Sequence, residues 1–322
     1  MLRKLMIALI GLTLLLAACA PAATPTPAPV VTEIPATLEP TLTEAPIPEP
    51  ISLTDGLGRT VELAGPAQRI VSLTPATTEI LFAVGAGPQV AGRDMFSDFP
   101  PEALEAADIG GSWGEYNTEA IVSLSPDLVI AGGINPPELV ASLEGLGLTV
   151  YFLSNPNTLE ELYTNIEILG SMTGNESAAS DLIASLDDRT KAVDTALAGV
   201  TEKPVVYYEL DSTPYTAGPG TFVDLLIARA GGTNFGASMD SAWAQISLEQ
   251  LIVANPAIIV LGDSAYGETA ETLAARPGWG ALAAIKGQQI FAFDDNLVSR
   301  PGPRLVDGLE ALARLIHPEA FK

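Results

Sequence analysis

The segment WGEYNTEAIVSLSPDLVI, residues 113–130, is the most informative part of the chain about its fold, because its pattern recurs about 130 residues later as WAQISLEQLIVANPAIIV, residues 243–260. In both copies a Trp is followed at the same spacing by a Glu, a Pro and an apolar triplet. Asn117 and Ser247 stand two residues before the Glu, where each predicts a helix start. The apolar triplet predicts a buried strand. Since internal repeats usually report repeated structural units, we expect two similar lobes.

The chain around the repeat alternates between strand and helix patterns. Arg69–Leu73 predicts a strand, and Thr74-Pro75 predicts the start of a helix. Between the lobes, an apolar stripe predicts one helix over residues 175–200, about 36 Å long at 1.5 Å per residue. The stripe consists of Ala179, Leu182, Ile183, Leu186, Val193 and Leu197. The predicted fold is therefore α/β, with two Rossmann-like lobes of mainly parallel sheets joined by one long α-helix.

The N-terminal 50 residues differ in composition from the rest. Arg3 and Lys4 precede an apolar run, Leu5–Leu16, that is short for a membrane span and predicts a signal peptide over residues 1–18. The stretch that follows, rich in Pro, Ala and Thr, predicts an extended tether. The expected organisation is a signal peptide (1–18), a Cys and tether (19–50), an N-terminal lobe (51–172), an interlobe helix (173–200) and a C-terminal lobe (201–322).

Charge and residue counts argue against several classes of function. The chain has 39 acidic and 15 basic residues, whereas nucleic-acid binding requires clustered Lys and Arg. It has one His and one Cys. The usual zinc sites need more ligands of these types, and a Ser-His-Asp site would need a His other than the one expected to have a structural role. We therefore expect no metal, no cofactor, no catalytic residues and no nucleic acid.

Five motifs in order resemble the substrate-binding proteins of ABC importers for cobalamin, haem and iron-siderophores. They are Asp55–Val61, Arg69–Pro75, Glu79-Ile80-Leu81, Pro126–Ile130 and Arg300-Pro301-Gly302-Pro303-Arg304. The resemblance implies the class III periplasmic-binding-protein fold, a monomer, a ligand held in an interlobe cleft, and a permease dimer with its ATPase as partner.

Within this group the chain is most similar to the vitamin B12-binding members, which implies cobalamin or a related corrinoid as ligand. The resemblance rests on Trp113 and Trp243, on the segment Ser97–Pro101 and on Tyr215–Gly218. Flat aromatic rings suit a bulky, apolar macrocycle. The expected ligand-binding residues are Trp113, Trp243, Phe96, Phe99, Tyr215 and Tyr116. The resemblance is incomplete at Gly132, where those members carry another Trp.

The same resemblance assigns roles outside the cleft. It implies that Glu119 and Glu249, one on each lobe, dock onto arginines of the two permease subunits. Leu16-Ala17-Ala18-Cys19 resembles the lipobox of bacterial lipoproteins, which implies lipidation of Cys19 and an extracytoplasmic, lipid-anchored protein.

Two alternatives stay open. The first is a haem or iron-siderophore binder of the same group, in which Tyr116 or Tyr215 holds haem iron or in which Arg93 and Arg300 supply cations to the cleft. The second is an exported two-lobed enzyme whose carboxylates, such as Asp211, Asp240 or Glu115, perform acid–base chemistry.

Overall fold

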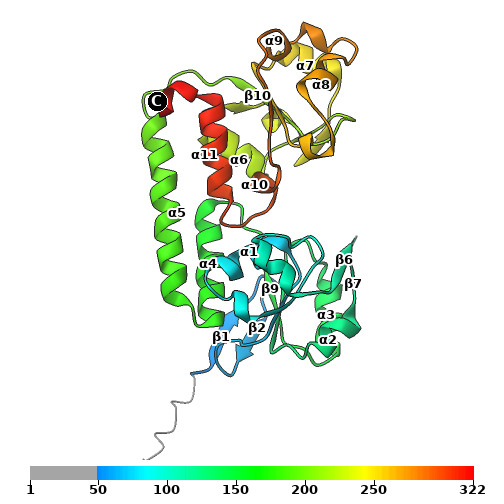
Figure 1. The fold of residues 1–322 in the computed structure, drawn as a ribbon, viewed down its shortest axis with the longest axis vertical. Coiled ribbons are helices and arrows are strands. Elements are labelled where there is room, and N and C mark those ends of the chain that lie inside the picture. Colours follow the sequence, from blue (N-terminus) through cyan, green and yellow to red (C-terminus); the bar gives the residue numbers. More distant parts are fainter. Residues whose placement is uncertain (1–48, 113) are drawn as a thin grey trace, which may run out of the picture. The chain divides into compact units, whose positions relative to one another are not determined.

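Two parallel sheets organise the chain, and the computed structural model describes residues 49–112 and 114–322 of it (Figure 1). The first sheet has the strand order β5-β4-β3-β8-β9 and the second the order β12-β10-β14-β15, with every neighbouring pair parallel. The strands of the first sheet are β3 (Ile70–Ser72), β4 (Val90–Arg93), β5 (Ala107–Asp108), β8 (Leu128–Gly132) and β9 (Val150–Leu153). Those of the second are β10 (Val205–Glu209), β12 (Thr233–Asn234), β14 (Ile258–Leu261) and β15 (Ile290–Ala292).

Three two-stranded antiparallel sheets lie outside these sheets. They pair β1 (Ile51–Thr54) with β2 (Thr60–Leu63), β6 (Gly110–Ser112) with β7 (Glu115–Tyr116), and β11 (Tyr215–Ala217) with β13 (Trp243–Gln245). In the first of them the Asp55 carboxylate accepts hydrogen bonds from the backbone N–H groups of Leu57 and Arg59, both at 3.0 Å, which fixes the turn.

Eleven α-helices connect or cover the strands in the described part of the chain. They are α1 (Pro75–Ala83), α2 (Thr118–Ser123), α3 (Pro137–Gly145), α4 (Leu159–Thr173), α5 (Glu176–Leu197), α6 (Phe222–Arg229), α7 (Leu248–Ala254), α8 (Ala270–Ala274), α9 (Ala283–Lys286), α10 (Asn296–Ser299) and α11 (Leu305–Ile316). None of the helices within residues 49–112 and 114–322 is both long and apolar enough to cross a membrane.

Each sheet is buried on both faces, as its apolar strands require. In β8, Leu128 and Ile130 belong to a core shared by both lobes, whereas Val129 between them packs into a separate cluster on the other face. In β14, Val260 points into the shared core and Ile259 into a third cluster. The α/β expectation of two lobes with mainly parallel sheets is therefore confirmed.

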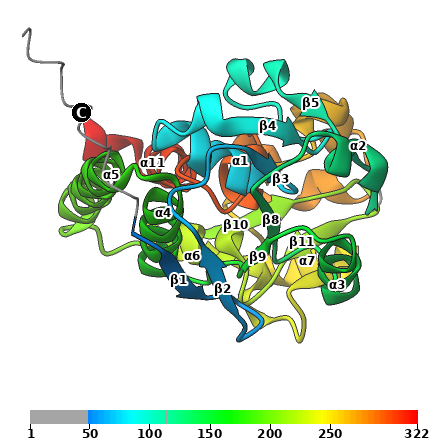
Figure 2. The same ribbon diagram turned by 90° about the horizontal axis from the view of Figure 1, so that it is seen from below.

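The long helix α5 connects the two lobes, as predicted. It packs against α4 of the first lobe and α11 of the second (Figure 2). Its residues Ala179, Leu186 and Val193 are buried in the shared core. Arg189 of α5 also binds the carboxylates of Asp307 and Glu310 on α11 at 2.5 and 2.9 Å. The helix is thus fixed to both lobes along its length.

The sequence repeat corresponds to a repeat in backbone structure. The Asn117 side chain caps α2 and the Ser247 side chain caps α7, each accepting an N–H from the first helical turn. Both helices are followed by a residue with positive φ directly before the Pro, Ser125 at 48° and Asn255 at 45°. The chain then enters an interior strand of its sheet, the one next to an edge strand: β8 beside β9 or β14 beside β15.

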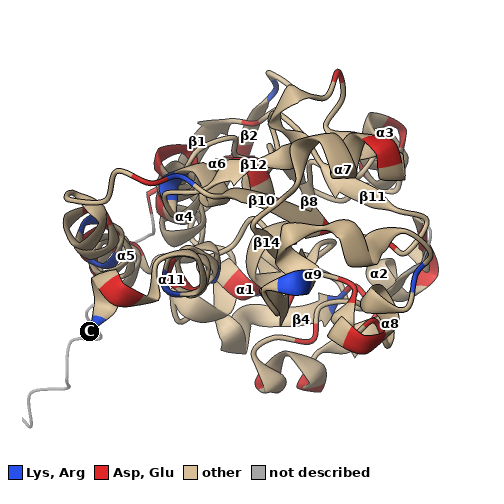
Figure 3. Cartoon of the chain, turned by 90° about the horizontal axis from the view of Figure 1, so that it is seen from above, with Lys and Arg blue, Asp and Glu red and all other residues tan. Residues whose placement is uncertain are grey.

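Charged side chains are distributed over many elements of both lobes. Figure 3 shows Lys and Arg scattered among the more numerous Asp and Glu rather than gathered on one element. Trp279, which lacks a counterpart in the repeat, is a buried core residue with the Arg276 guanidinium 4.8 Å from its ring centroid.

A close approach between α4 and α5 gives a test of this packing. A Cβ on Gly170 of α4 would lie 2.5 Å from the Cβ of Ala179 on α5, so Gly170→Val should force the two helices apart. We expect the free energy of unfolding to fall by about 1–3 kcal/mol, as for other overpacked sites. Urea denaturation measures it. Gly145→Val on α3, where a Cβ meets no atom within 4 Å, is the control. Equal stability of the two variants would contradict the described packing.

Candidate functional site

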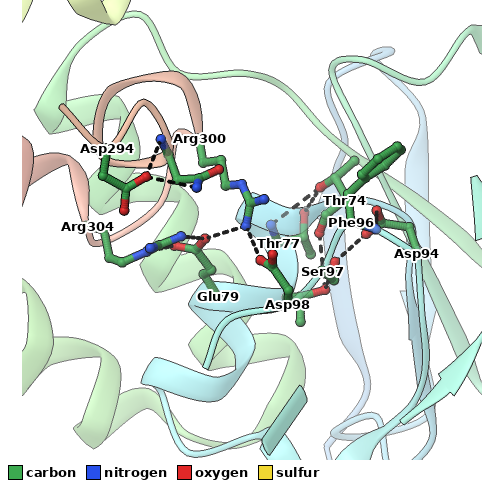
Figure 4. A network of polar contacts seen from close by, with 12 residues as sticks. Thr74, Thr77, Glu79, Asp94, Phe96, Ser97, Asp98, Asp294, Arg300 and Arg304 are labelled. Atoms are coloured by element: carbon green, nitrogen blue, oxygen red, sulfur yellow. Dashed lines mark hydrogen bonds and ion pairs between the residues drawn. The ribbon is translucent and has the colours of Figure 1, made fainter. Parts of the chain in front are cut away.

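The carboxyl-terminal edges of the two sheets face each other, because the segments that leave them are joined by ion pairs. In the first lobe, α1 follows β3 and the loop of residues 94–100 follows β4. In the second lobe, α10 and the start of α11 follow β15. Glu79 of α1 binds Arg304, and Asp98 of the loop binds Arg300 (Figure 4). In α/β proteins this edge is where ligands bind.

Glu79 is the buried centre of this junction. Its side chain is 2% exposed, and Arg304 donates to its two oxygens in a bidentate arrangement at 3.0 and 2.6 Å. The Nη1 atom of Arg300 lies 3.6 Å from the same carboxylate. A bidentate, largely buried pair of this kind is geometrically specific, so Glu79 fixes where both guanidinium groups lie.

Hydrogen bonds hold the loop after β4 in place. The buried Asp94 carboxylate accepts from the Ser97 hydroxyl and from the Phe96 backbone N–H. The Ser97 hydroxyl also lies 2.9 Å from that of Thr78 on α1. Burial raises the pKa of Asp94, although these hydrogen bonds and the nearby arginines oppose the shift.

The same loop exposes two of the predicted ligand-binding residues. Phe96 is 50% exposed, and Phe99 is 40% exposed with the Arg304 guanidinium 4.0 Å from its ring centroid. This cation–π contact links an aromatic ring of the first lobe to the second lobe. Figure 4 shows Phe96 projecting from the loop, away from Glu79.

Two more of the predicted residues share the two-stranded β11–β13 sheet of the second lobe. Tyr215 pairs with Gln245 and Ala217 pairs with Trp243, so Tyr215 and Trp243 lie on the same face as diagonal neighbours. Trp243 is 56% exposed, and Tyr215 is also exposed. An exposed Trp beside an exposed Tyr is a surface that can bind a flat, apolar molecule.

Tyr116, in contrast, uses its hydroxyl within the protein. The hydroxyl donates to the Leu73 carbonyl at 2.8 Å and accepts from the Asn135 side chain at 2.7 Å. Burial raises the pKa of Tyr116, which disfavours the phenolate that haem iron would require. Trp113 and Cys19 lie outside the described residues, so the predicted pair of Trp rings stays a prediction.

The two predicted docking residues occupy equivalent positions. Glu119 is an exposed residue in the first turn of α2, and Glu249 is an exposed residue in the first turn of α7. The helix dipole also stabilises a carboxylate in the first turn of a helix, so each Glu has a structural reason to stand there as well.

The arginines considered for the cleft are both engaged by the protein. Arg300 is paired with Asp98, and the mostly buried Arg93 donates to the Asp94 carbonyl at 2.9 Å and lies 4.0 Å from Asp108. Sequence reasoning noted the motifs that contain Glu79, Arg300 and Arg304 but missed that they pair. The sequence does place an acidic residue after one predicted strand and two arginines after another. Those positions predict an ion pair only once the carboxyl-terminal edges of the two sheets are known to face each other.

A second buried polar cluster lies at the carboxyl edge of the second sheet. Arg276 binds the fully buried Glu209 at 2.8 and 2.7 Å and Glu268 at 2.9 Å. Asp263 is buried nearby, and neither of its carboxylate oxygens has a hydrogen-bond partner among the residues that the structure describes. Across residues 49–112 and 114–322, no group of three or more His, Cys, Asp or Glu is arranged to hold a metal ion.

The carboxylates considered for an enzyme are not assembled into one group. Asp211 accepts hydrogen bonds from the backbone N–H and hydroxyl of Thr213, at 2.7 and 2.6 Å. Asp240 and Glu115 are exposed, and within the described residues no hydrogen bond joins either of them to Asp211.

Residues 70–297 match the periplasmic binding protein family. Among curated relatives, an uncharacterized ABC transporter substrate-binding lipoprotein of Bacillus subtilis (strain 168) is 30% identical over 85% of this chain and 87% of its own length. A vitamin B12-binding protein of Vibrio cholerae is 33% identical over 76% of this chain and 87% of its own length.

Solved structures of periplasmic binding proteins also resemble this chain. The periplasmic vitamin B12-binding protein of Vibrio cholerae superimposes with a TM-score of 0.68 at 30% identity, covering 80% of this chain and 99% of that chain. A periplasmic heme-binding protein from Roseiflexus sp. RS-1 gives a TM-score of 0.70 at 29% identity, covering 79% and 99%. The matches confirm the predicted resemblance and the class III fold. The family and these neighbours are substrate-binding transport proteins.

The buried Asp263 predicts a specific dependence of stability on pH. Burial, together with the adjacent Glu209 carboxylate, raises the pKa of Asp263 to about 7, whereas an unfolded Asp ionises near pH 4. Between these values the folded state binds the extra proton, so this group makes stability fall as pH rises through about 4–7. Asp263→Asn removes the charge and should raise the melting temperature at pH 8 by a few degrees, with little change at pH 4.

Circular-dichroism melting curves between pH 4 and pH 8 measure the effect, with Asp240→Asn as a control at an exposed Asp of the same lobe. If the Asp263→Asn and wild-type melting temperatures run parallel over this range, the buried carboxylate does not titrate as described.

Proposed function

The chain belongs to the periplasmic binding protein family, and from this premise we propose that it is the substrate-binding component of an ABC importer for cobalamin or a related corrinoid. In this proposal the ligand is captured between the facing sheet edges and delivered unchanged to the permease. The 33% identity to a vitamin B12-binding protein over most of the chain supports the ligand class.

The observation that carries the proposal is the exposed aromatic surface on segments from both sheet edges. Phe96 and Phe99 project from the first lobe, and Tyr215 and Trp243 share one face of the β11–β13 sheet in the second. Within the described residues these are four of five exposed aromatic side chains, the fifth being Tyr266. The four lie on or beside segments that follow the carboxyl-terminal sheet edges, where α/β proteins bind ligands. We propose that these residues, with Trp113 and Tyr116, line the ligand site.

The charge of the junction favours a neutral ligand over an anionic one. The two arginines that reach it, Arg300 and Arg304, are matched by Glu79 and Asp98. Haem is the alternative, supported by the similarity to the Roseiflexus heme-binding protein and by the exposed hydroxyl-bearing ring of Tyr215. The haem carboxylates would need a positively charged partner, and Arg300 and Arg304 are already paired with carboxylates of the protein.

We further propose that Glu119 and Glu249 dock onto the two permease subunits. Their equivalent positions in the repeated helices suit a two-fold partner, and exposed charges of this kind set orientation and association rate. The family and the lipoprotein relative support an extracytoplasmic location. We infer that Cys19 carries the lipid that anchors a monomeric protein to the membrane.

Ligand retention tests the proposed function. Cyanocobalamin should co-elute with the wild-type protein in gel filtration, detected by its visible absorbance. Trp243→Ala should weaken cyanocobalamin binding about 30-fold or more, as truncation of a central aromatic anchor does. Val253→Ala, which removes another well-exposed apolar side chain of the second lobe, should leave binding unchanged.

The same assay with haemin and ferric siderophores distinguishes the alternative ligands. Retention of haemin without retention of any corrinoid would reject the corrinoid proposal and favour the haem alternative. Undiminished cyanocobalamin binding by Trp243→Ala would remove this residue from the site.

The docking proposal predicts a separation of binding from transport. The double variant Glu119→Ala, Glu249→Ala should bind cyanocobalamin with unchanged affinity but lose cobalamin uptake in cells that depend on this importer, because the docking charges are gone. The double variant Glu62→Ala, Glu202→Ala removes two other exposed carboxylates and should retain uptake. Weakened ligand binding in the first variant would place these residues at the ligand instead.

A further inference from the structure

Among the described residues of the interlobe junction, Arg300 is the arginine whose closest carboxylate, that of Asp98, is exposed to solvent. Glu79, with a 2% exposed side chain, is engaged in a bidentate pair with Arg304. Arg300 lies 3.6 Å from Glu79 but only 2.6 Å from Asp98, whose side chain is 58% exposed. Each arginine thus has one close carboxylate, and Asp98 is the accessible one.

Asp98 lies among the residues proposed to contact the ligand. It stands in the loop between Phe96 and Phe99, two exposed aromatic residues. Partial burial would raise the pKa of Asp98, but the hydrogen bond and charge of Arg300 outweigh it and keep the pKa below its ordinary value. The loop is fixed by the hydrogen bonds of Asp94, so Asp98 is held beside Arg300.

The local charge follows from this arrangement. With Asp98 ionised, Arg300 and Arg304 are paired with two carboxylates, and Asp94 and Asp294 add further negative charge nearby, so an anionic ligand gains no net attraction. Without the Asp98 charge, Arg300 would lose its closest anionic partner while its side chain is still 16% exposed. At partly desolvated sites a single charge changes binding by a factor of ten or more.

Resting on the proposed function, we propose that Asp98 is a specificity-determining residue that excludes anionic macrocycles by neutralising Arg300. The ligand class that it admits is a neutral, amide-bearing macrocycle. The class that it excludes is a macrocycle or chelate that carries carboxylates or other anionic groups, for which Arg300 would otherwise be a natural partner.

The test compares cyanocobalamin with haemin, a flat macrocycle that carries two carboxylates. Asp98→Asn keeps an oxygen that can accept from Arg300 but removes the charge. It should bind haemin about tenfold more tightly than the wild type at low salt, with the gain shrinking as salt is added. Cyanocobalamin affinity should change less than about twofold, since its interaction with Arg300 involves no net ligand charge.

Two further variants isolate the cause. Glu102→Gln makes the same change in net charge at an exposed residue of the same lobe and should not gain haemin affinity. Adding Arg300→Gln to Asp98→Asn should abolish the gain. If Asp98→Asn fails to fold, as judged by circular dichroism, Arg300→Gln alone tests the proposal. This variant removes the positive charge and leaves the Asp98 carboxylate without its partner, so it should bind haemin more weakly than the wild type does.

The outcomes separate the two proposals. The role of Asp98 is overturned if Asp98→Asn gains no more haemin affinity than Glu102→Gln does. It is also overturned if the gain in haemin affinity persists when Arg300→Gln is added. In the non-folding case, unchanged haemin affinity of Arg300→Gln overturns it. A wild-type protein that retains no cyanocobalamin overturns the proposed ligand instead, and the haemin comparison still decides what Asp98 does.

Discussion

The ion pair between Glu79 and Arg304 holds the segments of the interlobe junction in register. A carboxylate that is almost completely buried is tolerated only when its charge is compensated, and Arg304 supplies two hydrogen bonds to it. Because Glu79 lies on α1 and Arg304 directly precedes α11, their pairing fixes one lobe against the other. The stacking of Arg304 on Phe99 and the approach of Arg300 to Asp98 both require that registration.

The long helix supplies a second constraint at a different place. Its apolar stripe is part of a core that includes residues of both lobes, and Arg189 binds two carboxylates of α11. Two lobes that share a core and are also joined by the largely buried Glu79–Arg304 pair have little freedom to rotate about a hinge. A ligand site built between such lobes is largely formed in advance, so less binding energy is lost in ordering it.

The two lobes are similar without being equivalent, and the difference bears on function. The repeat gives each lobe a capped helix with an exposed Glu in its first turn, which suits a partner with two-fold symmetry. The proposed ligand-binding aromatic residues follow the repeat only in part. Trp113 and Trp243 occupy equivalent positions in the two copies, whereas Phe96 and Phe99 come from a loop after β4 and Tyr215 comes from β11. The repeated Glu residues therefore serve the proposed docking, and the proposed ligand site combines repeated and unrepeated aromatic residues.

The local spacing of apolar and capping residues was enough to predict the fold class, the long helix and the positions of the caps. The apolar stripe of α5 and the capping residues Asn117 and Ser247 could be read directly from the chain. The pairing of Glu79 with Arg304, 225 positions apart, and the internal use of the Tyr116 hydroxyl are evident only in three dimensions. Pairing between distant residues leaves no local pattern, since it depends on how two sheet edges are placed in space.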